Sequence, residues 1–154
     1  MNKDALSFEN IQINNDLINE IWKFDPRTLD NVDGAKLSSY AMALAQYLIY
    51  FTYQRNLTKA EVTKLSTYID RTISLTMTDD PDILKKHKTK TAATEYLVST
   101  NMDLMEAQSK LDALKREITQ TEGIDKVVSE LIATIKRELT RRENELFQVR
   151  MERK

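Results

Sequence analysis

Basic side chains concentrate in two stretches of the sequence, where they could contact a phosphate backbone. The first holds four lysines around the only histidine, and the second is the C-terminal run KRELTRRENELFQVRMERK that begins at Lys136. Phosphates attract lysine and arginine whatever the base sequence, because neutralising them releases counterions. The candidate phosphate contacts are Lys85, Lys86, Lys88, Lys90, Arg137, Arg141 and Arg150.

The same residues also suit a solvated helix surface that binds nothing. Glu138 and Arg142 stand four positions apart, a spacing that allows an ion pair along a helix. Cations near a helix C-terminus also interact favourably with the helix dipole. A basic patch is necessary for binding a polyanion but is not specific for it, so both interpretations stay open.

Tyrosine side chains could add base stacking to phosphate contact. Tyr50 and Tyr53 lie off the main apolar stripe of their segment, close to Arg55, and are the candidates for stacking. Aromatic residues at helical spacing more often belong to a core or an interface, because burying their rings is strongly stabilising.

The sequence has none of the familiar signatures of catalysis or cofactor binding. Cysteine is absent, and the single histidine, His87, stands between lysines whose charge would repel a metal ion. Two glycines are too few for a phosphate-binding loop, and hydrolase, zinc-protease and EF-hand motifs are missing. We therefore expect no enzyme activity, no metal and no cofactor.

Composition predicts a helical protein of one domain. The 154 residues include two Gly and two Pro, and this scarcity favours long helices with few tight turns. No run of about 18 apolar residues is present, so we expect no membrane span. The formal net charge is −1, and the lack of cysteine fits a soluble, cytoplasmic protein.

The first half of the chain is predicted to hold an arm, a loop and a helical hairpin. Residues 1–34 form the arm and loop, with a short helix over 16–23 and with Trp22 and Phe24 as anchors. Residues 35–78 carry apolar stripes at helical spacing. Thr58 and Glu61 have the spacing of a capping box, so we favour a hairpin over one helix with a local break.

Residues 80–154 are predicted to form long helices, and from Leu97 onward they show a heptad pattern typical of coiled-coil or bundle packing. The pattern stays in phase across Gly123, which allows either an antiparallel hairpin turning there or one long helix bent there. The glycine and neighbouring polar residues favour the hairpin. The predicted oligomer seam comprises Leu97, Leu104, Leu111, Leu114, Ile118, Ile132, Ile135, Leu139, Leu146 and Val149.

These patterns predict an all-α fold, an elongated helical bundle with a C-terminal helical hairpin or a long coiled-coil-like helix. Amphipathic helices of this kind bury little apolar surface alone. We therefore expect the chain to be a homo-oligomer.

The layout resembles the phage UvsY-type recombination mediators. The resemblance is carried by DPRTLD, by YLVSTNMDLMEAQSKLDALKREI, and by the final segment IDKVVSELIATIKRELTRRENELFQVRMERK. It implies a small all-helical protein that assembles into rings, binds single-stranded DNA, and helps load a recombinase onto strands coated by single-strand-binding protein.

Two functions are therefore expected from the sequence. The first is a non-enzymatic single-stranded DNA-binding or recombination mediator protein, with a recombinase or single-strand-binding protein as its partner. The alternative is a coiled-coil structural or adaptor protein that binds another protein through its apolar helix faces.

Overall fold

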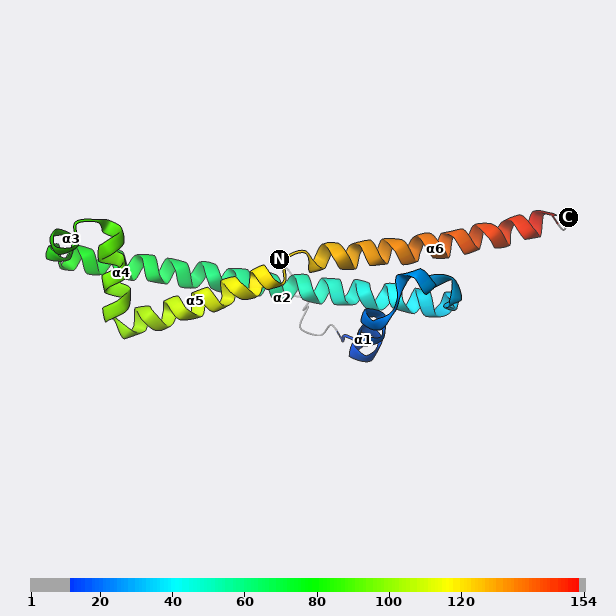
Figure 1. The fold of residues 1–154 in the computed structure, drawn as a ribbon, viewed down its shortest axis with the longest axis horizontal. Coiled ribbons are helices and arrows are strands. Elements are labelled where there is room, and N and C mark those ends of the chain that lie inside the picture. Colours follow the sequence, from blue (N-terminus) through cyan, green and yellow to red (C-terminus); the bar gives the residue numbers. More distant parts are fainter. Residues whose placement is uncertain (1–11, 153–154) are drawn as a thin grey trace, which may run out of the picture. The chain divides into compact units, whose positions relative to one another are not determined.

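The structure is a computed structural model that describes residues 12–152, and helices dominate these residues (Figure 1). No strand occurs in the described part of the chain, which confirms the predicted all-α fold class. The elements in chain order are α1 (Asn15–Lys23), the 3-10 helix η2 (Pro26–Asn31), α2 (Gly34–Asp79), α3 (Asp82–His87), α4 (Lys90–Thr100), α5 (Met102–Gln120) and α6 (Ile124–Glu152).

The chain divides into two compact units, and helix α2 contributes residues to both. Unit 1 contains the described residues up to Gln54 together with those from Gly123 onward. Unit 2 is the continuous segment Arg55–Glu122.

The predicted hairpin within residues 35–78 is wrong, because α2 is one helix of 46 residues. The segment around Thr58 contains neither glycine nor proline, and nothing in it forces the backbone out of the helix. Threonine can satisfy its hydroxyl inside a helix by donating to a carbonyl four residues earlier. Thr63 and Thr67 do this within α2, at 3.0 and 2.9 Å. The capping-box spacing was therefore not sufficient evidence for a helix start.

The short helix predicted over 16–23 is present, but the segment predicted as a loop contains the 3-10 helix η2. The predicted arm before residue 12 lies outside the described residues. Helix α1 covers Asn15–Lys23, and the Asn14 side chain caps it by accepting a hydrogen bond from the Leu17 amide at 3.0 Å. The ring of Trp22 packs edge-on against that of Tyr47, with 6.2 Å between the ring centroids. The ring of Phe24 packs edge-on against that of Tyr40, with 6.0 Å between the centroids. Both aromatic residues thus anchor the arm on α2, as the sequence indicated.

Each unit has its own apolar core, in which α2 packs against a helix from the C-terminal half. In unit 1, Leu37, Tyr40 and Leu44 of α2 share a core with Val128 and Ile135 of α6. The core of unit 2 contains Ile69, Ile73 and Met77 of α2, Ile83 of α3, Ala93 and Leu97 of α4, and Leu104 and Leu111 of α5.

The C-terminal half has one break that was predicted and two that were not. Helix α5 ends at Gln120 and α6 begins at Ile124, and between them Gly123 adopts a φ of +87°. The unexpected breaks lie at Lys88 and Thr89, and at Asn101. Asn101 ends α4, and its side chain caps α5 by accepting from the Asp103 and Leu104 amides at 3.0 and 3.2 Å.

Most of the predicted oligomer seam packs inside the chain. Leu97, Leu104 and Leu111 are buried in unit 2, and Ile135 is buried in unit 1. Four further seam residues are half-buried, namely Leu114, Ile118, Ile132 and Leu139. The expectation that other copies must cover this part of the seam is thus corrected, because α2 supplies an apolar partner. Leu146 and Val149 remain exposed.

Candidate nucleic-acid interface

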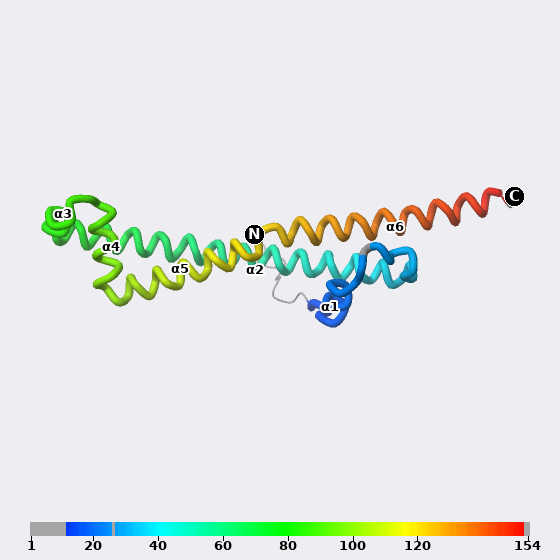
Figure 2. The backbone as a smooth tube through the Cα atoms, viewed as in Figure 1, coloured from blue at the N-terminus to red at the C-terminus, as the bar shows by residue number. Residues whose placement is uncertain are grey.

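The four lysines predicted to contact phosphate by the α3–α4 turn belong to unit 2, where Lys85 and Lys86 lie on α3, Lys88 follows it and Lys90 begins α4. Figure 2 shows the backbone of this turn. Buried Ile83 anchors the six-residue helix α3 in the core of this unit. Lys88 ends α3 with a φ of 54°, in the left-handed region that non-glycine residues seldom occupy. Thr89 then caps α4, and its hydroxyl accepts a hydrogen bond from the Ala92 amide at 3.1 Å.

All four lysines of this turn are exposed, but their charges are not equally free. Lys85 forms an ion pair with Asp82 of the same helix, with 2.7 Å between Nζ and Oδ1. Among residues 12–152, no carboxylate is paired with Lys86, Lys88 or Lys90. These three lysines form what we call the lysine turn, a short surface with positive charge that ion pairing does not offset.

An aromatic pair lies within the same turn and was not predicted. The rings of His87 and Tyr96 are stacked, with 4.3 Å between centroids and 26° between planes. Tyr96 nevertheless keeps 43% of its surface exposed. The pair was not predicted from the sequence, because it depends on the break at Lys88 and Thr89, which turns the chain so that α3 packs against α4.

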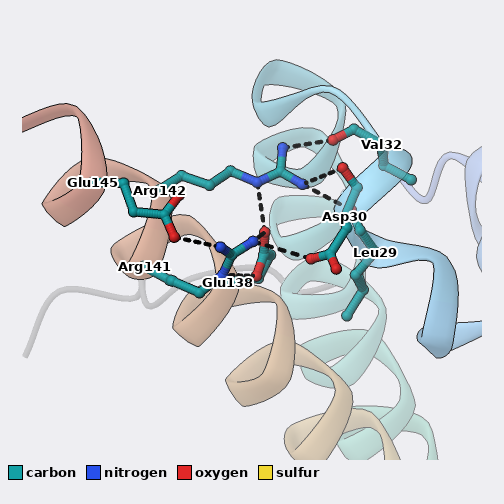
Figure 3. A network of polar contacts seen from close by, with 7 residues as sticks. All are labelled: Leu29, Asp30, Val32, Glu138, Arg141, Arg142 and Glu145. Carbon is teal, nitrogen blue, oxygen red and sulfur yellow. Dashed lines mark hydrogen bonds and ion pairs between the residues drawn. The ribbon is translucent and has the colours of Figure 1, made fainter. Parts of the chain in front are cut away.

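The C-terminal basic run belongs to unit 1, where Arg141 is surrounded by carboxylates (Figure 3). Its guanidinium donates to Glu138 at 2.7 and 2.8 Å, to Glu145 at 2.5 Å and to Asp30 at 3.0 Å. Three acidic groups thus oppose one arginine. This arrangement disfavours the predicted role of Arg141 as a phosphate contact.

Arg142 joins α6 to the carbonyl oxygens of η2 and the residue that follows it (Figure 3). Its guanidinium donates to Val32 at 2.6 Å, to Leu29 at 2.8 Å and to Asp30 at 3.2 Å. It also donates to the Glu138 carboxylate at 2.6 Å, so the predicted ion pair between these two residues is confirmed. The contacts with the carbonyls depend on the fold and could not be read from the heptad pattern.

Hydrogen bonds between arginines and carboxylates on α6 keep the side chains of Glu138 and Arg141 charged. Hydrogen bonds from Arg141, and then from Arg142, lower the pKa of Glu138 to about 2. The carboxylates of Glu138 and Glu145 in turn raise the pKa of Arg141 above its ordinary value. Near neutral pH the cluster therefore holds fixed charges, which suits a structural lock better than proton transfer.

The remaining predicted residues are divided between exposed and half-buried positions in unit 1. Arg137 and Arg150 are exposed on α6. Tyr50 and Tyr53 of α2 are half-buried, which limits the ring surface available to a base. The two predicted basic groups belong to different units, and the lysine turn combines three unpaired cations with an exposed ring that is stacked on a second ring.

The described residues form neither a metal site nor a membrane span. No group of three or more His, Asp or Glu side chains in residues 12–152 is placed to hold a metal ion. In the same residues, no helix has both the length and the apolar character that crossing a bilayer requires.

Comparison with known proteins identifies no relative of this chain. No protein-family model matches the sequence, and neither a curated protein nor a solved structure matches it.

Proposed function

We propose that this chain is a non-enzymatic single-stranded DNA-binding protein, a recombination mediator that acts as a homo-oligomer and helps load a recombinase. The observation that carries the proposal is the lysine turn, in which Lys86, Lys88 and Lys90 are exposed and unpaired among the described residues. The resemblance of the layout to the UvsY-type mediators supports the same function.

The spacing of the lysine turn favours a single strand over a duplex. Its three cations lie within five consecutive residues, at one tight turn of the backbone. A flexible single strand can bend to bring neighbouring phosphates to so short a surface, whereas a duplex presents its phosphates on a stiff helix. Each phosphate neutralised in a single strand contributes about 0.7 to the slope of log affinity against log salt.

Salt titration of DNA binding tests the proposal. Wild-type protein should bind a labelled oligothymidine at low salt and lose affinity steeply as salt is added. Replacing Lys86, Lys88 and Lys90 together by Gln should reduce the steepness by about 2, since up to three phosphate contacts disappear. The matched control replaces Lys23, Lys115 and Lys126 by Gln; these three exposed lysines lie outside both basic stretches, and the change removes the same charge.

The outcomes separate local contact from overall charge. A smaller slope in the first triple variant alone supports the lysine turn as the DNA contact. Equal effects of the two triple variants would mean that net charge is responsible and that the turn has no special role. Failure of the wild type to bind at low salt would remove the proposed function.

A second candidate function is an adaptor that binds another protein through an apolar helix face. It is favoured by the last turns of α6, where Leu146, Phe147, Val149 and Met151 are all exposed. An adaptor of this kind would be indifferent to nucleic acid, and charged substitutions on these four residues would abolish its association with the partner. The DNA titration therefore discriminates between the two functions.

A further inference from the structure

We propose that Tyr96, backed by His87, is the platform on which bases of the bound strand stack. The inference rests on the proposed function and adds to it a base-recognition surface. Aromatic rings bind single strands with little sequence preference, because every base has a π-face. The predicted ligand is therefore a single strand with accessible bases, rather than a polyanion in general.

The geometry of the ring pair supports this role. At 4.3 Å between centroids and 26° between planes, the His87 ring lies against that of Tyr96 and limits its motion. Tyr96 still exposes 43% of its surface, so part of the side chain remains open to a ligand. A ring held in place loses less conformational freedom when it binds a base than a mobile ring would.

The charges needed for the backbone of the strand lie beside the ring pair. Lys86 and Lys88 are the neighbours of His87 in the chain, and Lys90 begins the helix that carries Tyr96. The turn at Lys88 and Thr89 thereby places unpaired cations and a stacking surface on one short segment. This is the combination used by proteins that bind single strands, a cationic track with aromatic rings along it.

Tyr96 is the one exposed aromatic residue in the described part of the chain whose ring is stacked on a second ring beside unpaired cations. Tyr68 of α2 also belongs to unit 2, is 47% exposed and lines a hollow with the exposed cation of Lys64, but no described ring is stacked on it. Phe147 of α6 is 63% exposed and likewise has no described ring stacked on it. Trp22 in unit 1 is exposed but packs edge-on against Tyr47. Tyr50 and Tyr53, the predicted stacking residues, are half-buried. Tyr68 is therefore the matched control for Tyr96.

The experiment compares two oligonucleotides that have equal numbers of phosphates, an oligothymidine and a strand of abasic sites. Full-length wild-type protein should prefer the base-bearing strand by about ten-fold, as expected for stacking on one ring. Tyr96→Leu should lose most of this preference, whereas Tyr96→Phe, which keeps the ring, should retain it. Tyr68→Leu should behave like the wild type.

The helical content of every variant is measured by circular dichroism, because the ring pair also packs α3 against α4. Residual binding of the abasic strand provides the second check: it should be equal in wild type and Tyr96→Leu if the lysine turn is intact. If Tyr96→Leu disrupts the α3–α4 turn, it should bind both strands more weakly than wild type. The preference of Tyr96→Phe for the base-bearing strand would then show whether the ring is needed.

Each result bears on one of the two proposals. Equal wild-type affinity for both strands would overturn the stacking platform while leaving phosphate binding in place. An undiminished preference in Tyr96→Leu, or a preference lost in Tyr96→Phe, would likewise overturn it. No binding of either strand at low salt would overturn the proposed function, and the platform with it.

Discussion

Arg142 of α6 donates a hydrogen bond to the carbonyl of Val32 at 2.6 Å, and so links the C-terminal helix to the residue that caps the end of η2. The last carbonyls of a short helix have no partners within that helix and need donors from elsewhere. The guanidinium supplies several donors in a fixed plane, and Glu138 holds it in position from one turn earlier on α6. We call this set of contacts the arginine latch.

Removing the latch should destabilise unit 1. For Arg142→Ala we expect a loss of about 2 kcal/mol in the free energy of unfolding, because hydrogen bonds to a charged group are lost and carbonyls are left without donors. Arg142→Lys should recover only part of this, since an ammonium cannot reproduce the planar fork. Urea denaturation measures the change, with exposed Arg150→Ala as the control. Equal effects of the two alanine variants would contradict the latch.

Glu138 should make the stability of the protein depend on pH under acidic conditions. Its pKa is lowered from 4.5 to about 2 in the folded protein, chiefly by hydrogen bonds from Arg141. The unfolded chain therefore takes up this proton first as pH falls, and the stabilisation present above pH 4.5 is lost progressively towards pH 2.

Denaturation of wild type and Glu138→Gln at several pH values tests this dependence. The variant should be less stable than wild type at neutral pH, and the difference should shrink as the pH falls from 4.5 towards 2. Glu143→Gln, at an exposed position on the same helix, is the control. A difference between wild type and Glu138→Gln that stays constant over this range would refute the proposed linkage.

The two glycines should respond in opposite ways to alanine. Gly123 has a φ of +87°, which an alanine adopts only with strain, so Gly123→Ala should cost about 1 kcal/mol. Gly34 begins α2, and a β-carbon there would meet nothing within 4 Å. Gly34→Ala should therefore be neutral or stabilise by up to about 1 kcal/mol, by restricting the unfolded chain. Thermal denaturation of both variants checks the signs, and a stabilising Gly123→Ala would contradict the assigned backbone conformation.

Alanine should destabilise the protein at a seam residue that is buried inside the chain, but not at an exposed position nearby. Leu104 is fully buried in unit 2, whereas Met102, two residues earlier, is 79% exposed. Leu104→Ala should lower the free energy of unfolding by about 3 kcal/mol, through lost burial and the cavity left behind. Met102→Ala should change it by less than about 0.5 kcal/mol. Similar losses in both variants would show that this part of the seam is not packed within the chain.

Periodicity predicted which faces are apolar more successfully than it predicted where helices end. The stripes of α2 and the seam residues Leu97, Leu104 and Leu111 are found in the cores, because burial of an apolar face dominates helix packing. The break predicted at Thr58 is absent, and breaks occur instead at Lys88 and Asn101. Polar residues that can cap a helix are equally able to lie within one, and tertiary packing decides between these outcomes.

The candidate site was predictable only in part, for a related reason. Lysine spacing identified the exposed cations of the α3–α4 turn, since charged side chains seldom become buried. The ring pair of His87 and Tyr96 was missed, because it depends on a turn with a left-handed residue, Lys88, that propensities do not favour. The neutralisation of Arg141 was missed as well. Glu138 and Glu145 stand at helical spacing and could have indicated it, whereas Asp30 lies more than one hundred residues away in sequence.

The final turns of α6 provide a test of self-association. Leu139 packs against the core of unit 1, and the heptad pattern continues to Leu146 and Val149, both exposed. All described residues after Arg142 are exposed, so the pattern extends where no partner within the described chain covers it. Burial of these apolar side chains between copies would give the proposed homo-oligomer its driving force.

Light scattering after gel filtration should therefore give the wild type a mass above that of the 17.9 kDa chain. Leu146→Glu combined with Val149→Glu should shift it towards the monomer, because burying two carboxylates in an apolar contact is costly. Asn144→Glu with Gln148→Glu adds the same charge off the seam and should leave the mass unchanged. If the wild type is a monomer, or if the two double variants behave alike, the exposed end of the seam is not where copies of this chain meet.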